Sequence, residues 1–510
     1  MRSRRASGAS ACERQPLWAR PDELEDSNNK GLNNKRHLGL FSTALLLTNR
    51  MIGAAIFSVP SSIFLSVGSV GAALLLWVVG ILLTFCGFYI YLELGCLMPR
   101  TGGEKVYFET AYPRPYRLAS TLYAFYVLFG FPGMASIVVA DNTLLAFNIV
   151  PSEVEQRLAA IGIMALVAAC LSISREWSVR IVNSSSLLKL ATFLLILATA
   201  FAIVVGVLPS NVDTSANFRQ PFTGSSTTVY DYTVSLFKVL ESFLGWNSAG
   251  LVLGEVKNPQ RTLKVAGLLA VGSVGILYLL INVSYFIVAT PDDISRAGVQ
   301  LVARLLGNIF GNAASRVTAA MVALSTFGSM ISTAFVGTRV IRELALEGIV
   351  PAAGILSKTS KSGSPATATS VFLFGPSVVA VSFLPFGDAY AFLLDVNQYF
   401  LVMIYGAVVV ALFIIRQHVP SAEYPFRVWT WVPYLFLACQ VFLLLSPLVS
   451  PSGAGDTNLP FWLAPSVSFL VIGLGTMYWR LKSFVAAPAG DEPFWTRQDN
   501  PQSYGSVAAS

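Results

Sequence analysis

The sequence has 510 residues, of which 54% are hydrophobic and only 12% are charged. This charged share is about half of the roughly 25% found in soluble domains, and a soluble core could not hide so much apolar surface. We therefore predict an all-α integral membrane protein whose main solvent is the lipid bilayer. The two histidines and five cysteines have no metal or redox spacing, so we expect no metal, no cofactor and no enzyme activity.

About twelve segments are long and apolar enough to cross a membrane, since a helical span needs roughly 20 apolar residues. We predict one transmembrane domain over 38–481, between a disordered N-terminal tail over 1–37 and a C-terminal tail over 482–510. The predicted spans lie at 39–66, 70–97, 118–147, 156–174, 180–208, 232–256, 264–290, 314–344, 365–385, 388–416, 429–450 and 459–480.

The basic residues indicate which ends of the spans face the cytosol. Most of the 34 Lys and Arg residues fall in the two tails and in the loops on the same side of the membrane. Because cytosolic loops carry the excess of basic residues, we predict that both termini are cytosolic. This bias accounts for the net charge of +7, and nothing in it favours nucleic-acid binding.

Two spans are interrupted at corresponding depths. Span 1 carries a charge, a glycine and a proline within residues 50–60, and span 6 carries a carboxylate, glycines and an amide within 241–250. Such pairs are typical of transporters built from two inverted five-helix repeats, which we place at about 39–208 and 232–416, followed by extra helices over about 429–480. The alternative is a pair of kinks in ordinary spans, where Gly and Pro are also common.

Unwound backbone inside a membrane must face protein or a wet cavity, because lipid cannot satisfy its N–H and C=O groups. Freed amides after the break in span 1 suit a carboxylate, and freed carbonyls suit an ammonium group. A zwitterionic amino acid fits both, and the apolar side chains beside the breaks favour a neutral one. The candidate substrate-binding residues are Ile52, Gly53, Ala54, Ala55, Ile56, Phe243, Leu244, Gly245, Trp246 and Asn247.

Five short motifs occur in a characteristic order along the membrane region, at residues 49–53, 99–105, 245–247, 255–259 and 325–329. In this order and spacing they resemble the amino acid–polyamine–organocation superfamily, in its L-type amino acid transporter branch. Within that branch the sequence is most similar to the fungal high-affinity methionine permeases. The resemblance covers nearly the whole membrane region.

The resemblance implies a LeuT-type fold with discontinuous helices 1 and 6, and proton-driven uptake of neutral amino acids across the plasma membrane, methionine especially. An exchanger of broader neutral specificity and a transporter-like nutrient sensor stay open as alternatives. Better-known relatives have a hydroxyl residue where this chain has Ala54, which removes one contact to a substrate carboxylate. The loop at 148–157 lacks the cysteine that pairs animal relatives with a heavy subunit, so we expect no disulfide-linked partner.

Charged residues inside membrane spans are functional candidates, because their burial is costly. In the resembled family, a lysine at the place of Lys189 can stand where sodium-coupled relatives bind sodium. Its ammonium would tether the inner half of span 1 to span 8, through Ser325 or Ser329. The alternative is a lysine that extends its amine to the membrane surface.

Arg50 immediately precedes the break in span 1. We expect it to pair with Glu93, Glu104 or Glu255 as part of an inner gate, and simple structural pairing is the alternative. Glu255 is itself a candidate gate residue at the inner end of span 6. A plain charge pair at a helix end explains Glu255 almost as well.

Glu241 lies within two helical turns of the break in span 6. Desolvation favours the protonated form of a carboxylate, so a carboxylate at this depth could take up a proton on one side and release it on the other. We predict that Glu241 contributes to proton coupling or contacts the substrate ammonium. The alternative is a structural pair with Lys238.

Overall fold

The structure is a computed structural model that describes residues 39–53, 55–98, 103–115, 117–173, 175–208, 213–251, 259–358, 367–420, 424–448 and 459–485. All regular elements within these ranges are helices, which confirms the prediction of an all-α protein. The predicted N-terminal tail lies outside the described residues, as does all of the predicted C-terminal tail beyond residue 485.

The first part of the chain forms helices of 8 to 30 residues. In chain order these are α2 (Leu40–Met51), α3 (Ala55–Val67), α4 (Val70–Leu97), α5 (Glu104–Ala111), α6 (Leu118–Phe129), α7 (Ala135–Ala146), α8 (Glu153–Ile173) and α9 (Arg175–Val204). The start of α4 follows from its sequence, because Ser69 Oγ accepts a hydrogen bond from the Ala72 amide at 3.3 Å and caps the first turn.

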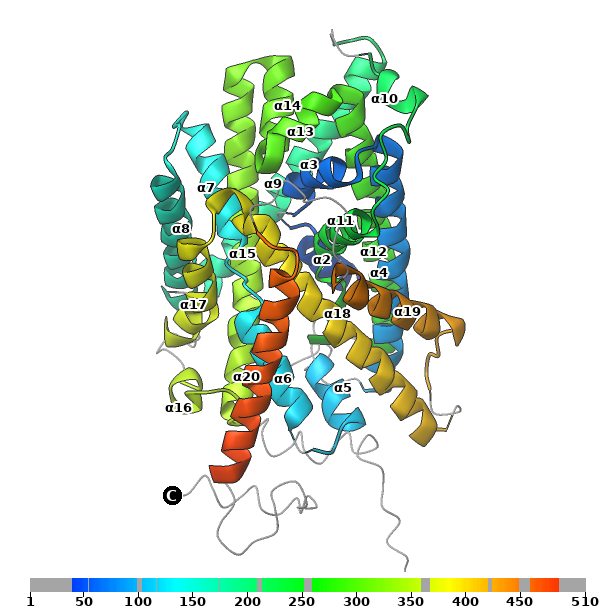
Figure 1. The fold of residues 1–510 in the computed structure, drawn as a ribbon, viewed down its shortest axis with the longest axis vertical. Helices are drawn as coiled ribbons and strands as arrows, with labels where there is room; N and C mark the ends of the chain where they lie inside the picture. Colours follow the sequence, from blue (N-terminus) through cyan, green and yellow to red (C-terminus); the bar gives the residue numbers. More distant parts are fainter. Residues whose placement is uncertain are drawn as a thin grey trace, which may run out of the picture.

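In the second part of the chain, short helices lie between the long ones. It comprises α10 (Ala216–Arg219), α11 (Val229–Ser242), η2 (Trp246–Leu251), α12 (Pro259–Val288), α13 (Pro291–Ala297), η4 (Gly298–Gln300), α14 (Leu301–Phe310), α15 (Asn312–Leu346), α16 (Ala353–Leu356), α17 (Thr367–Phe383), α18 (Phe386–His418), α19 (Trp431–Leu445), η6 (Ser446–Leu448) and α20 (Leu463–Val485). Figure 1 shows α10, α13 and α14 at the upper end of the bundle and α5 and α16 at the lower end.

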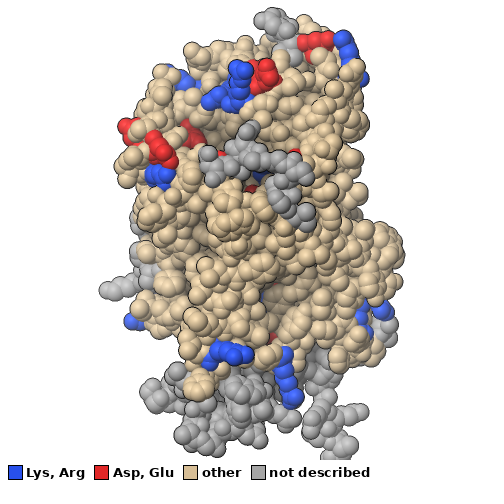
Figure 2. Space-filling model, viewed as in Figure 1, with Lys and Arg blue, Asp and Glu red and all other residues tan. Residues whose placement is uncertain are grey.

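Within the described residues, seven helices are long and apolar enough to cross a membrane, and α2 with α3 forms an eighth candidate span bent by 43°. The seven are α4, α8, α9, α12, α15, α18 and α19 with η6. Charged side chains gather toward the two ends of the face in Figure 2, and the broad band between them is almost free of charge. A multi-pass membrane protein follows from both observations.

Both predicted breaks are present. In span 1 the helix ends at Met51 and resumes at Ala55, and in span 6 α11 ends at Ser242 and the 3₁₀ helix η2 begins at Trp246. The broken spans pack inside the bundle, where α12 contacts α2 and α11 contacts α3 and α18. This placement surrounds the freed backbone groups with protein, as a lipid environment requires.

The structure shows a break, which the sequence analysis did not predict, within the predicted span over 118–147. Helix α6 ends at Phe129 and α7 begins at Ala135. Between them Phe131 has a positive φ of 48°, and the Gly133 amide donates to Ser377 Oγ of α17 at 3.0 Å. The break thus replaces a lost helical hydrogen bond with one to a neighbouring helix.

Candidate functional site

The two breaks that the sequence predicts meet directly. Gly245 has a φ of +119°, a conformation that only glycine adopts readily. A Cβ at this position would lie 2.9 Å from the carbonyl carbon and oxygen of Arg50. The backbone of span 6 therefore approaches the backbone of span 1 as closely as a glycine permits.

The hydroxyl of one tyrosine, Tyr278, lies within hydrogen-bonding distance of one backbone carbonyl from each break. Tyr278 of α12 is fully buried, and its hydroxyl lies 2.9 Å from the Met51 carbonyl and 3.0 Å from the Ser242 carbonyl. These carbonyls belong to the last residues of α2 and α11, where the helical ladder ends. The sequence analysis gave Tyr278 no place in the site, because its role depends on packing between three helices.

A cavity of about 220 Å³ lies where the breaks meet. It is smaller than the roughly 300–1,000 Å³ usual for drug-sized ligands, so it suits a small solute. Its wall includes residues of α2, α3, α5, α6, α7, α11, η2, α15, α17 and α18. The predicted site residues that line it are Arg50, Gly53, Ala55, Glu241, Leu244, Gly245, Asn247 and Ser329.

Four predicted substrate-binding residues do not line this cavity and act as packing residues in this structure. Ile52 and Ile56 are buried in the hydrophobic core. The ring of Phe243 packs against Tyr278 at 5.0 Å, and that of Trp246 packs against Tyr91 at 4.8 Å, both measured between centroids. Among the remaining site predictions, Ala54 and Glu255 lie outside the described residues.

Arg50 points into the cavity and, within the described residues, forms no ion pair with Glu93 or Glu104. The third expected partner, Glu255, lies outside the described residues. Arg50 Nε donates to Ser248 Oγ and Arg50 Nη1 to Thr333 Oγ1, each at 3.3 Å. Of the expected partners, Glu93 instead forms an ion pair with Arg416 at 2.6 Å. Arg50 thus connects η2 to α15 across the cavity through neutral hydroxyl groups.

Lys189 of α9 reaches the inner half of span 1, as predicted. Its Nζ lies 3.2 Å from Asn49 Oδ1 and 3.4 Å from the Asn49 carbonyl oxygen. Within the described residues no hydrogen bond joins Lys189 to α15, where Ser325 Oγ is buried without a partner and Ser329 Oγ donates to the Ser325 carbonyl. Of the two contacts expected of the ammonium, the one to span 1 is therefore present, and the one to α15 is absent among the described residues.

We expect Lys189→Ala to lower the initial rate of substrate uptake by about tenfold or more, because it removes hydrogen bonds to a charged group beside the break. The rate is measured per molecule in the membrane. Lys264→Ala, an exposed lysine on α12, is the matched control and should keep uptake near the unmodified level. Uptake by the unmodified protein should also persist without sodium, and sodium-dependent uptake would contradict the assignment.

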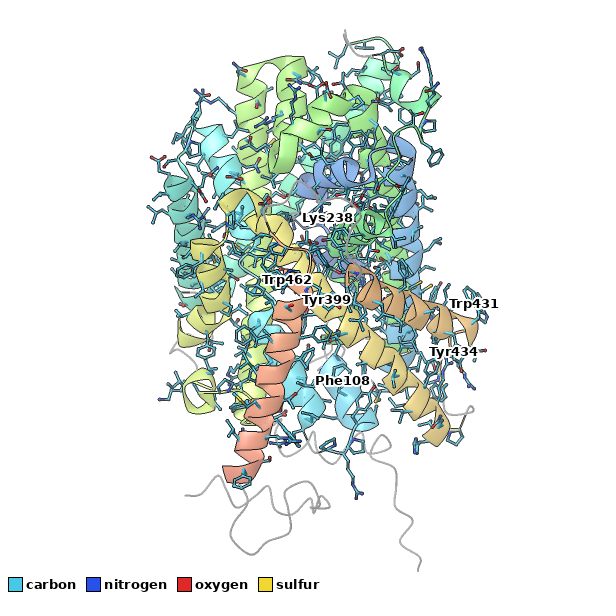
Figure 3. All side chains as sticks on the ribbon, in the orientation of Figure 1. Phe108, Lys238, Tyr399, Trp431, Tyr434 and Trp462 are labelled. Atoms are coloured by element: carbon cyan, nitrogen blue, oxygen red, sulfur yellow. The ribbon has the colours of Figure 1, made fainter. Side chains whose placement is uncertain are left out.

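Glu241 is buried and is held by two amides of α18 rather than by Lys238. Its Oε2 accepts from Asn397 Nδ2 at 3.0 Å and from Gln398 Nε2. Within the described residues, Glu241 takes part in no ion pair. Figure 3 places Lys238 among the side chains inside the bundle, where the carboxylates that attract it are Asp395 and Asp231.

The sequence analysis considered Glu104 only as a partner of Arg50 in an inner gate, and it did not predict the break between α6 and α7. Glu104 and the break between α6 and α7, at Gly130, Pro132 and Met134, both line the cavity. The run Gly130-Phe131-Pro132-Gly133 is a signal for the break, since two glycines and a proline interrupt an apolar segment. Burial raises the pKa of the Glu104 carboxyl, and the hydrogen bonds that it accepts lower this pKa in part.

Comparison with known proteins places nearly the whole helical region in one group. A family profile described as "Amino acid permease" matches residues 38–474. The high-affinity methionine permease of Saccharomyces cerevisiae is 31% identical over 456 residues, which cover 87% of this chain and 79% of that protein. The low-affinity methionine permease of the same yeast is 28% identical over 466 residues, with 89% and 83% covered. The b(0,+)-type amino acid transporter 1 of Rattus norvegicus is 27% identical over 444 residues, with 86% and 88% covered.

Proposed function

Because the chain belongs to the amino acid permease family, as its motifs predicted, we propose that it is a secondary active transporter that imports neutral amino acids. Methionine is the best single candidate, since two methionine permeases are among its relatives. The observation that carries the proposal is the meeting of two broken helices at one small cavity. The same family membership assigns the protein to transport rather than to enzyme catalysis.

The backbone of the cavity suits a zwitterion. Gly53 and Ala55 line it at the start of α3, where the first-turn amides have no helical partner and attract a carboxylate. Leu244 and Met330 add apolar surface to the wall, which favours an uncharged side chain. The lost hydroxyl at Ala54 removes one carboxylate contact, so in this proposal backbone amides supply the binding.

The charges around the cavity support coupling to protons. Its acidic and basic lining residues are Arg50, Glu104 and Glu241, which together carry one excess negative charge when all are ionised. A bound zwitterion leaves that excess unchanged, and an uncompensated charge in a desolvated site is costly. One proton would neutralise it. We place this proton on Glu241, which within the described part of the chain has neither a cation partner nor a role in the backbone contacts.

We also propose the full architecture that the resemblance implies. The chain would cross the plasma membrane twelve times, with inverted repeats over about 39–208 and 232–416 and both termini in the cytosol. The spans beyond the eight candidates would be α6 with α7, α11 with η2, α17 and α20. The cysteine-free loop at 148–157 implies no disulfide-linked heavy subunit.

The test is uptake of a panel of labelled amino acids by permease-deficient cells that express the protein, with the external pH varied. We expect uptake of neutral amino acids, with methionine among the best, and faster accumulation at acidic external pH. Cells without the protein give the background rate. Preferred uptake of polyamines or cationic amino acids would overturn the substrate class.

The same cells separate net import from exchange. Cells depleted of internal amino acids should still accumulate label, because a proton gradient can drive import without a counter-substrate. Uptake that requires preloaded amino acids would identify an exchanger of broader specificity. Saturable binding without measurable transport would identify a sensor.

A further inference from the structure

Glu104 is a buried carboxylate whose hydrogen-bond donors come from three different elements. It is 4% exposed, and its Oε1 accepts from Tyr91 of α4 at 3.1 Å and from Asn247 Nδ2 of η2 at 2.5 Å. Its Oε2 accepts from Tyr123 of α6 at 3.4 Å. Within the described residues no ion pair includes Glu104. All three donors are neutral, so the contacts fix geometry without adding a compensating cation.

The helix that carries Glu104 lies at the lower end of the bundle (Figure 1), where it contacts two neighbouring helices. Glu104 is the first residue of α5. The next residue, Lys105, forms an ion pair with Glu347 just after α15, and the hydroxyl of Tyr112 donates to the Ala407 carbonyl of α18 at 2.7 Å. The carboxylate therefore projects from a helix that neighbouring helices hold in place.

The residue that Glu104 holds belongs to the broken part of span 6. Asn247 lies two residues after Gly245, whose backbone touches that of Arg50. Ser248, the next residue, accepts a hydrogen bond from Arg50 Nε at 3.3 Å. Both Asn247 and Glu104 line the cavity, so the position of η2 decides the shape of the wall that a substrate would meet.

We propose that Glu104 is a positioning residue of the transport site, whose carboxylate holds the Asn247 amide and so fixes η2 against α4, α5 and α6. The inference deepens the proposed function and rests on transport through this cavity. The requirement is geometric: one partner must donate and the other must accept. An exchange of these two roles should preserve the contact.

The experiment exchanges donor and acceptor in full-length protein, through Asn247→Asp, Glu104→Gln and the double variant. Asn247→Asp sets two carboxylates face to face and should raise the apparent KM for methionine by about tenfold or more. Glu104→Gln keeps an oxygen for Asn247, so its KM should stay within about threefold of the unmodified protein. In the double variant the introduced glutamine amide would donate to the introduced carboxylate. The KM should then return most of the way to that of the unmodified protein. Glu109→Gln, on the same helix but outside the cavity lining, is the control.

Other roles for Glu104 give other patterns, and each would overturn the proposal. Direct charge contact with the substrate predicts that Glu104→Gln raises KM as strongly as Asn247→Asp, without recovery in the double variant. A merely structural role predicts altered abundance with an unchanged KM in every variant. If Asn247→Asp fails to reach the membrane, recovery of membrane protein and of KM in the double variant supports the pairing, and no recovery overturns it.

The test also separates this inference from the proposed function. If the unmodified protein transports none of the amino acids, the proposed function is wrong, but the contact between Glu104 and Asn247 can still be tested. The melting temperatures of the four purified proteins then decide the pairing. Recovery in the double variant would support the contact, and its absence would overturn it.

Discussion

Gly245→Ala should abolish measurable uptake while the protein still reaches the membrane. A side chain at φ +119° costs about 1–3 kcal/mol in backbone strain. The added Cβ would also lie 2.6 Å from Arg50 Cγ and 2.9 Å from the Arg50 carbonyl group. Because backbone atoms form part of this contact, one rotamer change cannot relieve it. We expect the two breaks to separate and the wall of the cavity to lose its shape.

The matched control is Gly272→Ala, in the middle of α12. A Cβ there would meet its nearest neighbour, Phe85 Cζ, at an ordinary 3.7 Å, and alanine is the better helix former. We expect uptake near the unmodified level from this variant. The two variants are compared by their initial rates of uptake per molecule in the membrane. A Gly245→Ala protein with a normal KM and rate would show that close approach of the breaks is not needed for transport.

The sequence predicted the all-helical membrane class and two of the breaks because both leave local signals. Gly53 and Gly245 each interrupt an apolar segment beside an ionisable residue, which is visible without any tertiary contact. The break between α6 and α7 was missed although glycines and a proline mark it, because no ionisable residue stands beside them; a non-glycine residue, Phe131, takes the positive φ. Its backbone is satisfied by Ser377, far away in sequence. Apolar patterning alone cannot reveal that contact.

The sequence predicted which segments form the site, but not which of their side chains face the cavity. Leu244 lines the cavity and Phe243 packs away from it, because the turn after Ser242 changes the direction of successive side chains. Glu104 follows a polar segment with two glycines, which predicts an exposed loop. Its burial comes from packing of α5 against α6 and α18. Burial of this kind depends on tertiary structure and leaves no periodic pattern in the sequence.

Glu241→Gln should remove pH-driven accumulation while amino acid exchange continues. Both amides that hold Glu241 donate to the same oxygen, Oε2. The side-chain oxygen of glutamine can accept both of these bonds, so the substitution preserves shape and removes only the ability to gain or lose a proton. With no proton carried, accumulation should no longer increase at acidic external pH. Exchange of internal for external amino acid needs no net proton movement and should persist.

Three outcomes of Glu241→Gln have different physical meanings. Lost accumulation with retained exchange identifies Glu241 as the proton-coupling residue, because only the titratable group has gone. A raised apparent KM at every pH would instead identify contact with the substrate ammonium, which loses a charge-assisted hydrogen bond. Unchanged uptake at every pH would exclude both roles. Glu343→Gln, an exposed carboxylate on α15, controls for the general effect of charge removal, and its pH profile should match that of the unmodified protein.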